Sequence, residues 1–265
     1  MKANIKIVLI SIIVILMTMV LAPFQYMAVK LDWKLCRKVP IFWHRVVLKL
    51  MGIRTIVHGE ITRQRPLMIV ANHISWMDII LLGSVGELCF IAKNEVDESP
   101  GSNFLARMQR TIFVVRENRK EVGRQAKEIT ERMLEGDPIV LFAEGTTGDG
   151  HRVLDFKSSL FGATHYATRH GNADKVFVQP IVLSYTKQHG MPLGYSGRTR
   201  AAWTGDMIMP PHIAFIIRNG PWDVEISIEE PIEIDQSTRR QTIAMMTREK
   251  IRQTFLKTTY GHEVD

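Results

Sequence analysis

The stretch RPLMIVANHISWMDIILLGSV, residues 65–85, places two apolar runs on either side of a short polar segment. Residues 65–71 are typical of a buried β-strand, and residues 75–85 are typical of a helix. Ser75 suits the N-cap of that helix, and Asp78, three residues later, suits its first turn. We therefore expect a strand, a turn and a helix in this order.

Segments of the same two kinds alternate along the rest of the chain. Strands are expected at residues 88–96, 111–116, 138–145, 175–185 and 223–234, and helices at 118–136 and from Ser237 to about Thr258. Residues 187–221, rich in Gly, Pro, Arg and His, are expected to be irregular. This alternation predicts an α/β fold with a mostly parallel central sheet flanked by helices.

The N-terminal region contains 23 uncharged residues in succession, at positions 7–29. That length is enough to cross a hydrocarbon core about 30 Å thick. A cleaved signal peptide is the alternative, but its apolar region is usually shorter and ends in a small-residue cleavage site. We interpret residues 1–35 as a membrane anchor and residues 36–265 as a separate globular domain. Pro23 leaves insertion into a single leaflet open as well as a full span.

Basic residues follow the apolar run, and the positive-inside tendency then places the body of the protein on the cytoplasmic side. We expect the membrane to be the cell inner membrane. A further helix is expected to begin at Pro40, where proline is tolerated in the first turn. It could lie against acidic lipid or pack on the domain.

The net charge of +7 suits an anionic partner, such as nucleic acid, an acidic membrane surface or a phosphorylated substrate. The sequence has no zinc finger, RNA-binding signature or long basic block, so we expect no nucleic-acid partner. The nine histidines show no metal-binding spacing, and no metal site is expected.

His73 and Asp78 are the candidate reactive pair. Positions five apart lie about 140° around a helix, so the two side chains meet only if His73 precedes the helix. Asp78 could be only a capping acid. However, polar residues at the end of a buried strand lie where open α/β sheets form ligand sites. A neutral imidazole oriented by a carboxylate can take the proton of an alcohol. Because no G-x-S-x-G motif or activated cysteine is evident, direct attack by the hydroxyl of a substrate is expected.

Residues 72–78, NHISWMD, resemble the first motif of the glycerolipid acyltransferases, and most closely that of the 1-acylglycerol-3-phosphate acyltransferases. Those enzymes make phosphatidic acid from a lysophospholipid and an acyl thioester. Three further blocks resemble the family in the same order: residues 90–116 with Lys93, Pro100, Phe113 and Arg116; residues 141–150 with Glu144, Gly145 and Thr146; and residues 178–185 with Pro180.

The resemblance implies that His73 is the base and that Asp78 orients it. It also implies that Asn72, Lys93, Arg116, Glu144, Gly145 and Thr146 bind the acceptor. The acyl donor would be acyl-CoA or acyl carrier protein, with no other cofactor. The remaining partners would be the lysophospholipid acceptor and membrane lipid.

The sequence departs from the family pattern at three positions. Asn103 and Arg110 stand where the family often has glycine, and Thr147 stands where an arginine often follows the third-block threonine. The missing charge leaves open an alternative acceptor, lyso-ornithine lipid, whose head group carries a carboxylate. Two other hypotheses are a membrane-anchored lipid-binding protein without turnover and a metal-dependent lipid hydrolase. The first has no need of a base, and the second lacks a ligand cluster.

Overall fold

The computed structural model describes residues 2–33, 35–93, 100–114, 119–170, 173–205 and 207–261. The strands are β1 (Ile53–His58), β2 (Leu67–Ala71), β3 (Cys89–Lys93), β4 (Ile112–Val114), β5 (Ile139–Phe142), β6 (Lys175–Gln188), β7 (Met191–Pro192), β8 (Trp222–Ile228) and β9 (Ile232–Asp235). The helices are α1 (Lys2–Lys30), α2 (Leu35–Met51), α3 (Met77–Val85), α4 (Pro100–Met108), α5 (Arg119–Leu134), α6 (Gly162–His170), α7 (Tyr195–Ala201), α8 (Met209–Asn219) and α9 (Arg240–Tyr260), with a 3-10 helix at Ser158–Phe161.

The strands of the described residues form one sheet in the order β1-β8-β6-β2-β5-β3-β4, and β7 and β9 also pair with β6. Strand β2 lies parallel to both of its neighbours, β5 and β6, and all five of its residues are buried. The antiparallel pairs all involve β6, which binds β7, β8 and β9 in this orientation. The predicted α/β fold with a mostly parallel central sheet is therefore confirmed, and its centre is β2.

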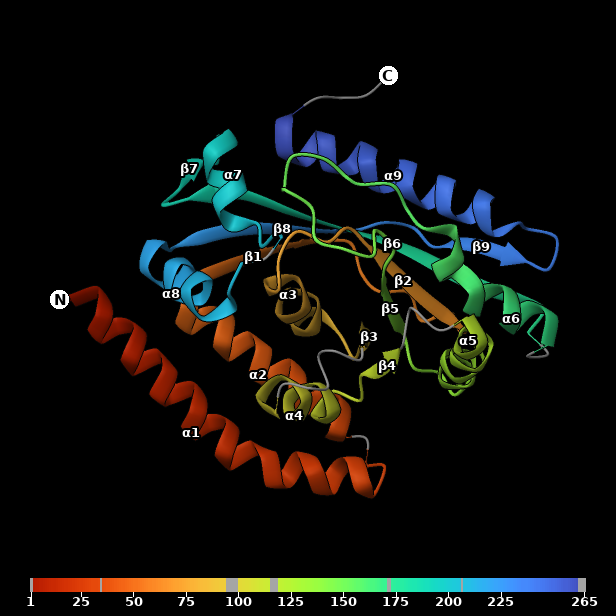
Figure 1. The fold of residues 1–265 in the computed structure, drawn as a ribbon, viewed down its shortest axis with the longest axis horizontal. Helices are drawn as coiled ribbons and strands as arrows, with labels where there is room; N and C mark the ends of the chain where they lie inside the picture. The colour runs from red at the N-terminus through yellow and green to blue at the C-terminus, as the bar shows by residue number, and fades with distance from the viewer. Residues whose placement is uncertain are drawn as a thin grey trace.

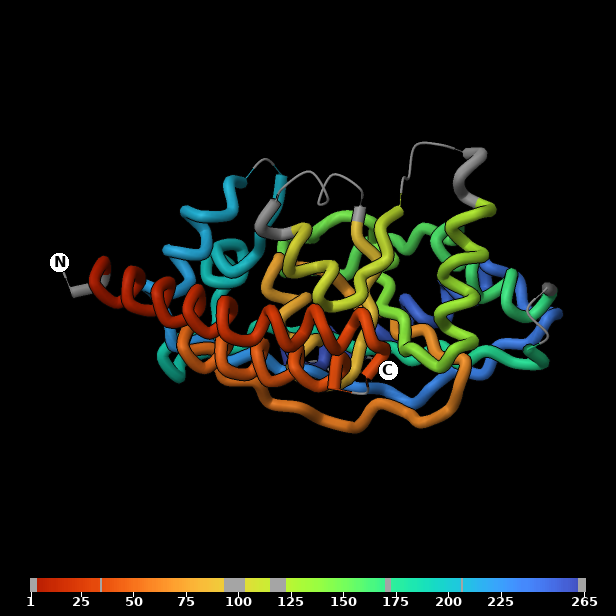
Figure 2. The backbone as a smooth tube through the Cα atoms, turned by 90° about the horizontal axis from the view of Figure 1, so that it is seen from below, coloured from red at the N-terminus to blue at the C-terminus, as the bar shows by residue number. Residues whose placement is uncertain are grey.

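Helices cover both faces of the sheet (Figure 1). Helix α9 runs along one face, and α2, α3 and α4 lie on the other side. Helix α1 lies outside this second layer and runs along the flank of the domain, as Figure 2 shows from a second direction. By length and composition, α1 is the helix among the described residues that could cross a membrane.

Side-chain hydrogen bonds join both ends of α1 to the domain. Near its N-terminus, Lys6 Nζ donates to the carbonyl of Ile217 in α8 at 3.1 Å. Near its C-terminus, Gln25 Nε2 donates to the carbonyls of Cys36 and Met108, at 2.7 and 2.6 Å. The helix is thus bound along its length.

The helix predicted to begin at Pro40 begins five residues earlier, at Leu35, and Pro40 lies inside it. It packs against α3 and β1 on the domain, with α1 on its other side. Residues 187–221 are not irregular, because they form α7 and α8. Pro210 and Pro211 occupy the first turn of α8, where proline costs little, so they mark the start of a helix.

Other boundaries also differ from the sequence prediction. The strand expected at 223–234 is divided into β8 and β9, with Pro231 immediately before β9. The last helix begins at Arg240, and Ser237 does not cap it, because its hydroxyl donates to Asp235. Strand β1 and helices α4 and α6 were not predicted.

Helices α2 and α3 approach each other closely at Gly83. A Cβ atom on Gly83 would lie 2.3 Å from the ring of His44, which is 4% exposed and cannot move aside. We expect Gly83→Ala to lower the free energy of unfolding by about 1–3 kcal/mol through overpacking.

The matched control is Gly123→Ala in α5, where no atom lies within 4 Å of the new methyl group. There alanine should raise stability by about 0.5–1 kcal/mol, because glycine is a poor helix former. Thermal unfolding of both variants in detergent measures the difference. Equal melting temperatures would contradict the tight α2–α3 contact.

Candidate active site

His73 lies two residues beyond the end of β2, at the carboxyl edge of the parallel strands. Ala71, the last residue of β2, pairs with Phe142 of β5 and with Ile181 of β6. The imidazole ring stacks on the ring of Phe142, with centroids 4.0 Å apart and an interplanar angle of 16°. The histidine therefore sits at the edge where open α/β sheets form their ligand sites.

The carboxylate of Asp78 is fully buried and accepts hydrogen bonds from four groups. Its Oδ2 atom lies 2.8 Å from His73 Nδ1, 2.6 Å from the backbone nitrogen of Ile74 and 2.8 Å from that of Ser75. Its Oδ1 atom accepts the hydroxyl of Tyr185 at 2.7 Å. One oxygen of Asp78 therefore binds the histidine and also accepts two backbone N–H groups ahead of α3.

Ser75 is not the N-cap that the sequence predicts. Helix α3 begins at Met77, and Trp76 occupies the N-cap position without a side-chain capping bond. Asp78, in the first turn of α3, instead reaches back to the backbone N–H groups of Ile74 and Ser75, which precede the helix and belong to the turn after β2.

The contact with Asp78 fixes the tautomer of His73. A carboxylate only accepts hydrogen bonds, so Nδ1 carries the proton and Nε2 keeps its lone pair. The His73 side chain is 16% exposed, and Nε2 makes no hydrogen bond within the described residues. This nitrogen is therefore open to a substrate and can act as a base.

Asn72 links the turn after β2 to the neighbouring strand β6. It is 2% exposed. Its Nδ2 atom donates to the carbonyl of Leu183 at 3.0 Å, and its Oδ1 atom accepts the N–H of Leu183 at 2.8 Å. The sequence predicts Asn72 as an acceptor-binding residue, but the protein itself uses its amide, which holds His73 in place.

The loop after β5 encloses His73 from the other side. The backbone N–H of Gly148 donates to the carbonyl of His73 at 2.7 Å. Gly145 has φ +74°, which favours glycine, and Thr146 is exposed at the turn. Glu144, Gly145 and Thr146 thus lie in the loop that contacts the candidate base.

Glu144 is 3% exposed, and its Oε2 atom has no hydrogen-bond partner among the described residues. Burial raises its pKa to about 8, although backbone hydrogen bonds from His73 and Leu154 oppose the shift. At neutral pH the side chain is therefore mainly a neutral carboxylic acid, tied to the backbone of His73.

Two residues of the site were missed by sequence reasoning. Tyr185 stands at the end of the fourth block, but only the fold brings its hydroxyl to Asp78. Lys157 is the second. Its ammonium group lies beside Gly145, because a Cβ atom added to that glycine would be 3.0 Å from Nζ. Arg116 lies outside the described residues. Lys93 ends β3, and its side chain is likewise outside the described part of the chain.

Titration of Glu144 should change stability with pH. Its pKa is 4.5 in the unfolded chain and about 8 when folded, so the folded state retains a proton that the unfolded state loses. Stability is therefore lost as the pH rises from about 4.5 to about 8, by on the order of 3–5 kcal/mol. Glu144→Gln mimics the neutral form and should remove this loss.

Melting temperatures at pH 5 and pH 9 in detergent measure the effect. The control is Glu128→Gln, at an exposed position of α5, which should keep the wild-type pH dependence. The same change in melting temperature between pH 5 and pH 9 in wild type and in Glu144→Gln would contradict a raised pKa of Glu144.

Comparisons with known proteins identify the family to which the chain belongs. The family model described as Acyltransferase matches residues 54–184. The chain is 41% identical over 266 residues to a lyso-ornithine lipid O-acyltransferase of Brucella abortus, covering 100% of this chain and 99% of the relative. It is 40% identical over 248 residues to a lyso-ornithine lipid O-acyltransferase of Rhizobium meliloti, covering 94% and 85%.

Among solved structures, the fold is similar to the 1-acyl-sn-glycerophosphate acyltransferase PlsC from Thermotoga maritima. The TM-score is 0.66 at 21% identity, and the match covers 96% of this chain and 97% of the other. The shared fold, the family match and the full-length relatives lead to one conclusion: the chain belongs to the glycerolipid acyltransferase family.

Proposed function

We propose that the protein transfers a fatty acyl group from an acyl thioester to the free hydroxyl of a lysolipid, with lyso-ornithine lipid as the acceptor. The observation that carries the proposal is the His73–Asp78 pair, in which Nδ1 is bound by the carboxylate and Nε2 is free of protein contacts within the described residues. The donor would be acyl-CoA or acyl carrier protein.

In the proposed reaction, Nε2 of His73 accepts the proton of the acceptor hydroxyl as its oxygen attacks the thioester carbonyl. A C–O bond forms, the C–S bond breaks, and the proton on Nε2 passes to the leaving thiolate. Asp78 stabilises the imidazolium and orients it throughout. Four donors already compensate the buried charge of Asp78, so it can remain an acceptor during the reaction.

No acyl-enzyme is needed in this scheme. Both cysteines are buried and line a pocket that includes Asp137, a residue just before the amino end of β5. Burial raises the pKa of the Cys89 thiol to about 11, which leaves only a small thiolate fraction at neutral pH and makes it a slow nucleophile.

Two observations support lyso-ornithine lipid over 1-acylglycerol-3-phosphate as the acceptor. Two relatives with lyso-ornithine lipid as their named acceptor match nearly the whole chain at 40% and 41% identity. The third block carries Thr147 in place of a further arginine. A carboxylate bears less charge than a phosphate, so it needs fewer cations.

The arrangement of α1 supports attachment to one leaflet of the membrane. Lys6 and Gln25, near opposite ends of α1, both bind the domain, so a helix docked in this way does not carry its N-terminus across a bilayer. Its outer face exposes large apolar side chains, among them Ile5, Val8, Leu9, Ile12, Ile15, Leu16, Met19, Val20 and Phe24. We propose that this face lies in lipid, with the domain on the cytoplasmic side of the inner membrane.

Removal of the base should abolish most of the activity. We expect His73→Ala and Asp78→Asn each to lower kcat about 100- to 10,000-fold, because the first removes the base and the second disturbs its tautomer. The matched control is His58→Ala on β1, where the side chain is 56% exposed and distant in the sheet order from β2. Near-wild-type turnover in both variants would refute the mechanism.

The acceptor is tested with a mixed panel. Purified protein is given lyso-ornithine lipid and 1-acylglycerol-3-phosphate together, with labelled acyl-CoA or acyl carrier protein, and the products are identified by mass spectrometry. Ornithine lipid should dominate, and Thr147→Arg should shift the product ratio toward phosphatidic acid. Preferential formation of phosphatidic acid by the wild type would overturn the assignment of acceptor but leave the family chemistry in place.

Tyr185 should contribute through Asp78. Burial, followed by the charge of Asp78, raises its pKa well above 10, so its hydroxyl remains a donor at working pH. Tyr185→Phe removes a hydrogen bond to a charged group, and kcat should fall roughly 10- to 100-fold with little change in KM. The control is Tyr26→Phe at an exposed position of α1. An unchanged kcat would show that the three remaining donors suffice.

A further inference from the structure

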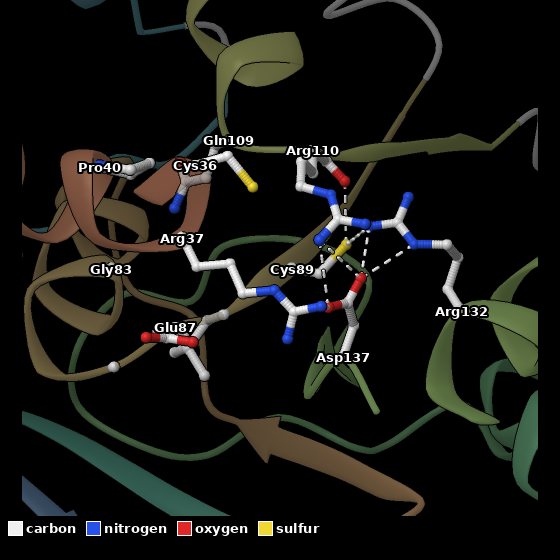
Figure 3. A pocket seen from close by; sticks show the side chains of 12 residues that line it. Cys36, Arg37, Pro40, Gly83, Glu87, Cys89, Gln109, Arg110, Arg132 and Asp137 are labelled. Carbon is white, nitrogen blue, oxygen red and sulfur yellow. Dashed lines mark hydrogen bonds and ion pairs between the residues drawn. The ribbon is translucent and has the colours of Figure 1, made fainter. Parts of the chain in front are cut away.

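A polar pocket lies near the amino end of β5, whereas His73 lies near its carboxyl end, and Figure 3 shows the side chains that line this pocket. It is lined by residues that include Cys36 and Arg37 of α2, Cys89 at the start of β3, Arg110, Arg132 of α5 and Asp137. Strand β5 runs from this pocket to Phe142, which stacks on His73. The length of that strand places the two sites roughly 16 Å apart.

Three guanidinium groups converge on one carboxylate in this pocket. The side chain of Asp137 is 5% exposed. Its Oδ1 atom lies 3.0 Å from Arg37 and 3.3 Å from Arg110, and its Oδ2 atom lies 2.7 Å from Arg132. Two of the three positive charges therefore have no buried counter-charge in the described part of the chain.

Two acids at the rim offset that charge only weakly. Glu135 pairs with Arg132 at 3.9 Å, but its side chain is 64% exposed, and exposed ion pairs contribute little. Glu87 also lines the pocket, but it is exposed and lies to one side of the guanidinium groups in Figure 3. Cys89 is a neutral thiol, which donates to the carbonyl of Arg110 at 3.0 Å. The excess positive charge also affects Arg65. Burial lowers the pKa of Arg65, and the nearby charge of Arg37 lowers it further.

The backbone of Arg110 adds a separate observation. Its φ is +58°, in the left-handed region that favours glycine. The arginine side chain is nevertheless brought into the pocket. Its guanidinium contributes to a site whose planar donors suit the oxygens of a phosphate.

The position of the pocket indicates where a ligand would come from. It lies at the corner where α1 is followed by α2, and the linking residues Leu31, Trp33 and Leu35 are 51%, 50% and 49% exposed. Apolar and tryptophan side chains beside lysine and arginine are typical of a membrane–water interface. The cavity has a volume of about 20 Å³, which is room for one water-sized group. A ligand would therefore place one oxygen inside the cavity, and the rest of the ligand would stay outside.

We propose that Arg37, Arg110 and Arg132 form a second anion site, which binds a phosphate oxygen of an acidic membrane phospholipid at the α1–α2 corner. The bound lipid supplies the missing negative charge and holds the domain against the membrane. This inference uses the proposed membrane attachment but does not depend on the acceptor. Its readout below is independent of activity.

The two thiols provide a local reporter, because Cys36 and Cys89 are the only cysteines in the sequence and both line the pocket. The full chain in detergent is mixed with vesicles of phosphatidylcholine, with or without phosphatidylglycerol, and alkylated with uncharged N-ethylmaleimide. Peptide mass spectrometry then gives the rate at each cysteine. A parallel arm replaces the vesicles with inorganic phosphate at the same phosphorus concentration.

We expect phosphatidylglycerol to slow alkylation several-fold in the wild type and in Lys38→Gln, which removes an exposed charge beside the pocket. The ratio of rates with and without phosphatidylglycerol should return to about one in Arg37→Gln. It should do so also in Arg110→Gly, which removes a guanidinium while suiting the positive φ, so misfolding does not obscure the result.

Three outcomes would overturn the proposal. No slowing in the wild type would leave the cluster as an internal ion-pair network only. Equal slowing in Arg37→Gln would show that general membrane contact shields the thiols. Protection by inorganic phosphate but not by phosphatidylglycerol would assign the site to a free anion and reject the lipid.

Discussion

The buried carboxylate of Asp78 is the interaction on which the rest of the site depends. A carboxylate removed from water is costly unless donors surround it, and here every donor comes from a different structural element or a different part of the turn. The imidazole of His73, two backbone amides and the hydroxyl of Tyr185 all point at it. The same hydrogen bonds that satisfy the charge therefore fix the turn, the first residues of α3, and the orientation of the ring.

The sheet extends this constraint beyond the turn. Strand β6 is bound to β2 along one edge and reaches past its end, which brings Leu183 opposite Asn72 and Tyr185 opposite Asp78. The loop after β5 closes the other side through Gly148 and Glu144. Residues distant in the sequence thus hold one histidine from both neighbouring strands, and the chemistry proposed for it needs no residue to move within the protein.

Much of the fold and the central pair could be predicted from the sequence, for physical reasons. Strands buried on both faces give continuous apolar runs, and the five-residue spacing of His73 and Asp78 allows a contact only across a strand-to-helix turn. Contacts that depend on strand order could not be predicted, because nothing local to Tyr185 or Lys157 indicates which loop they meet. Exposed edge strand β1 gives no apolar run, and the paired prolines of α8 look like helix breakers until their position in the first turn is known. Ser75 is a residue type that often caps helices, but α3 begins one residue later than this prediction requires, and Asp78 binds the backbone of the turn before the helix.

The stacking of Phe142 on His73 has a consequence for the approach of any reacting molecule. One face of the ring is covered, and its Nδ1 edge is held by Asp78, so rotation about either side-chain torsion would break a contact. The lone pair on Nε2 consequently points in a single direction before a substrate arrives. Such preorganisation removes much of the orientational entropy that an unrestrained imidazole would lose in the transition state. In the proposed reaction, the packing of Phe142 from the neighbouring strand would therefore set the direction from which the hydroxyl oxygen reaches His73.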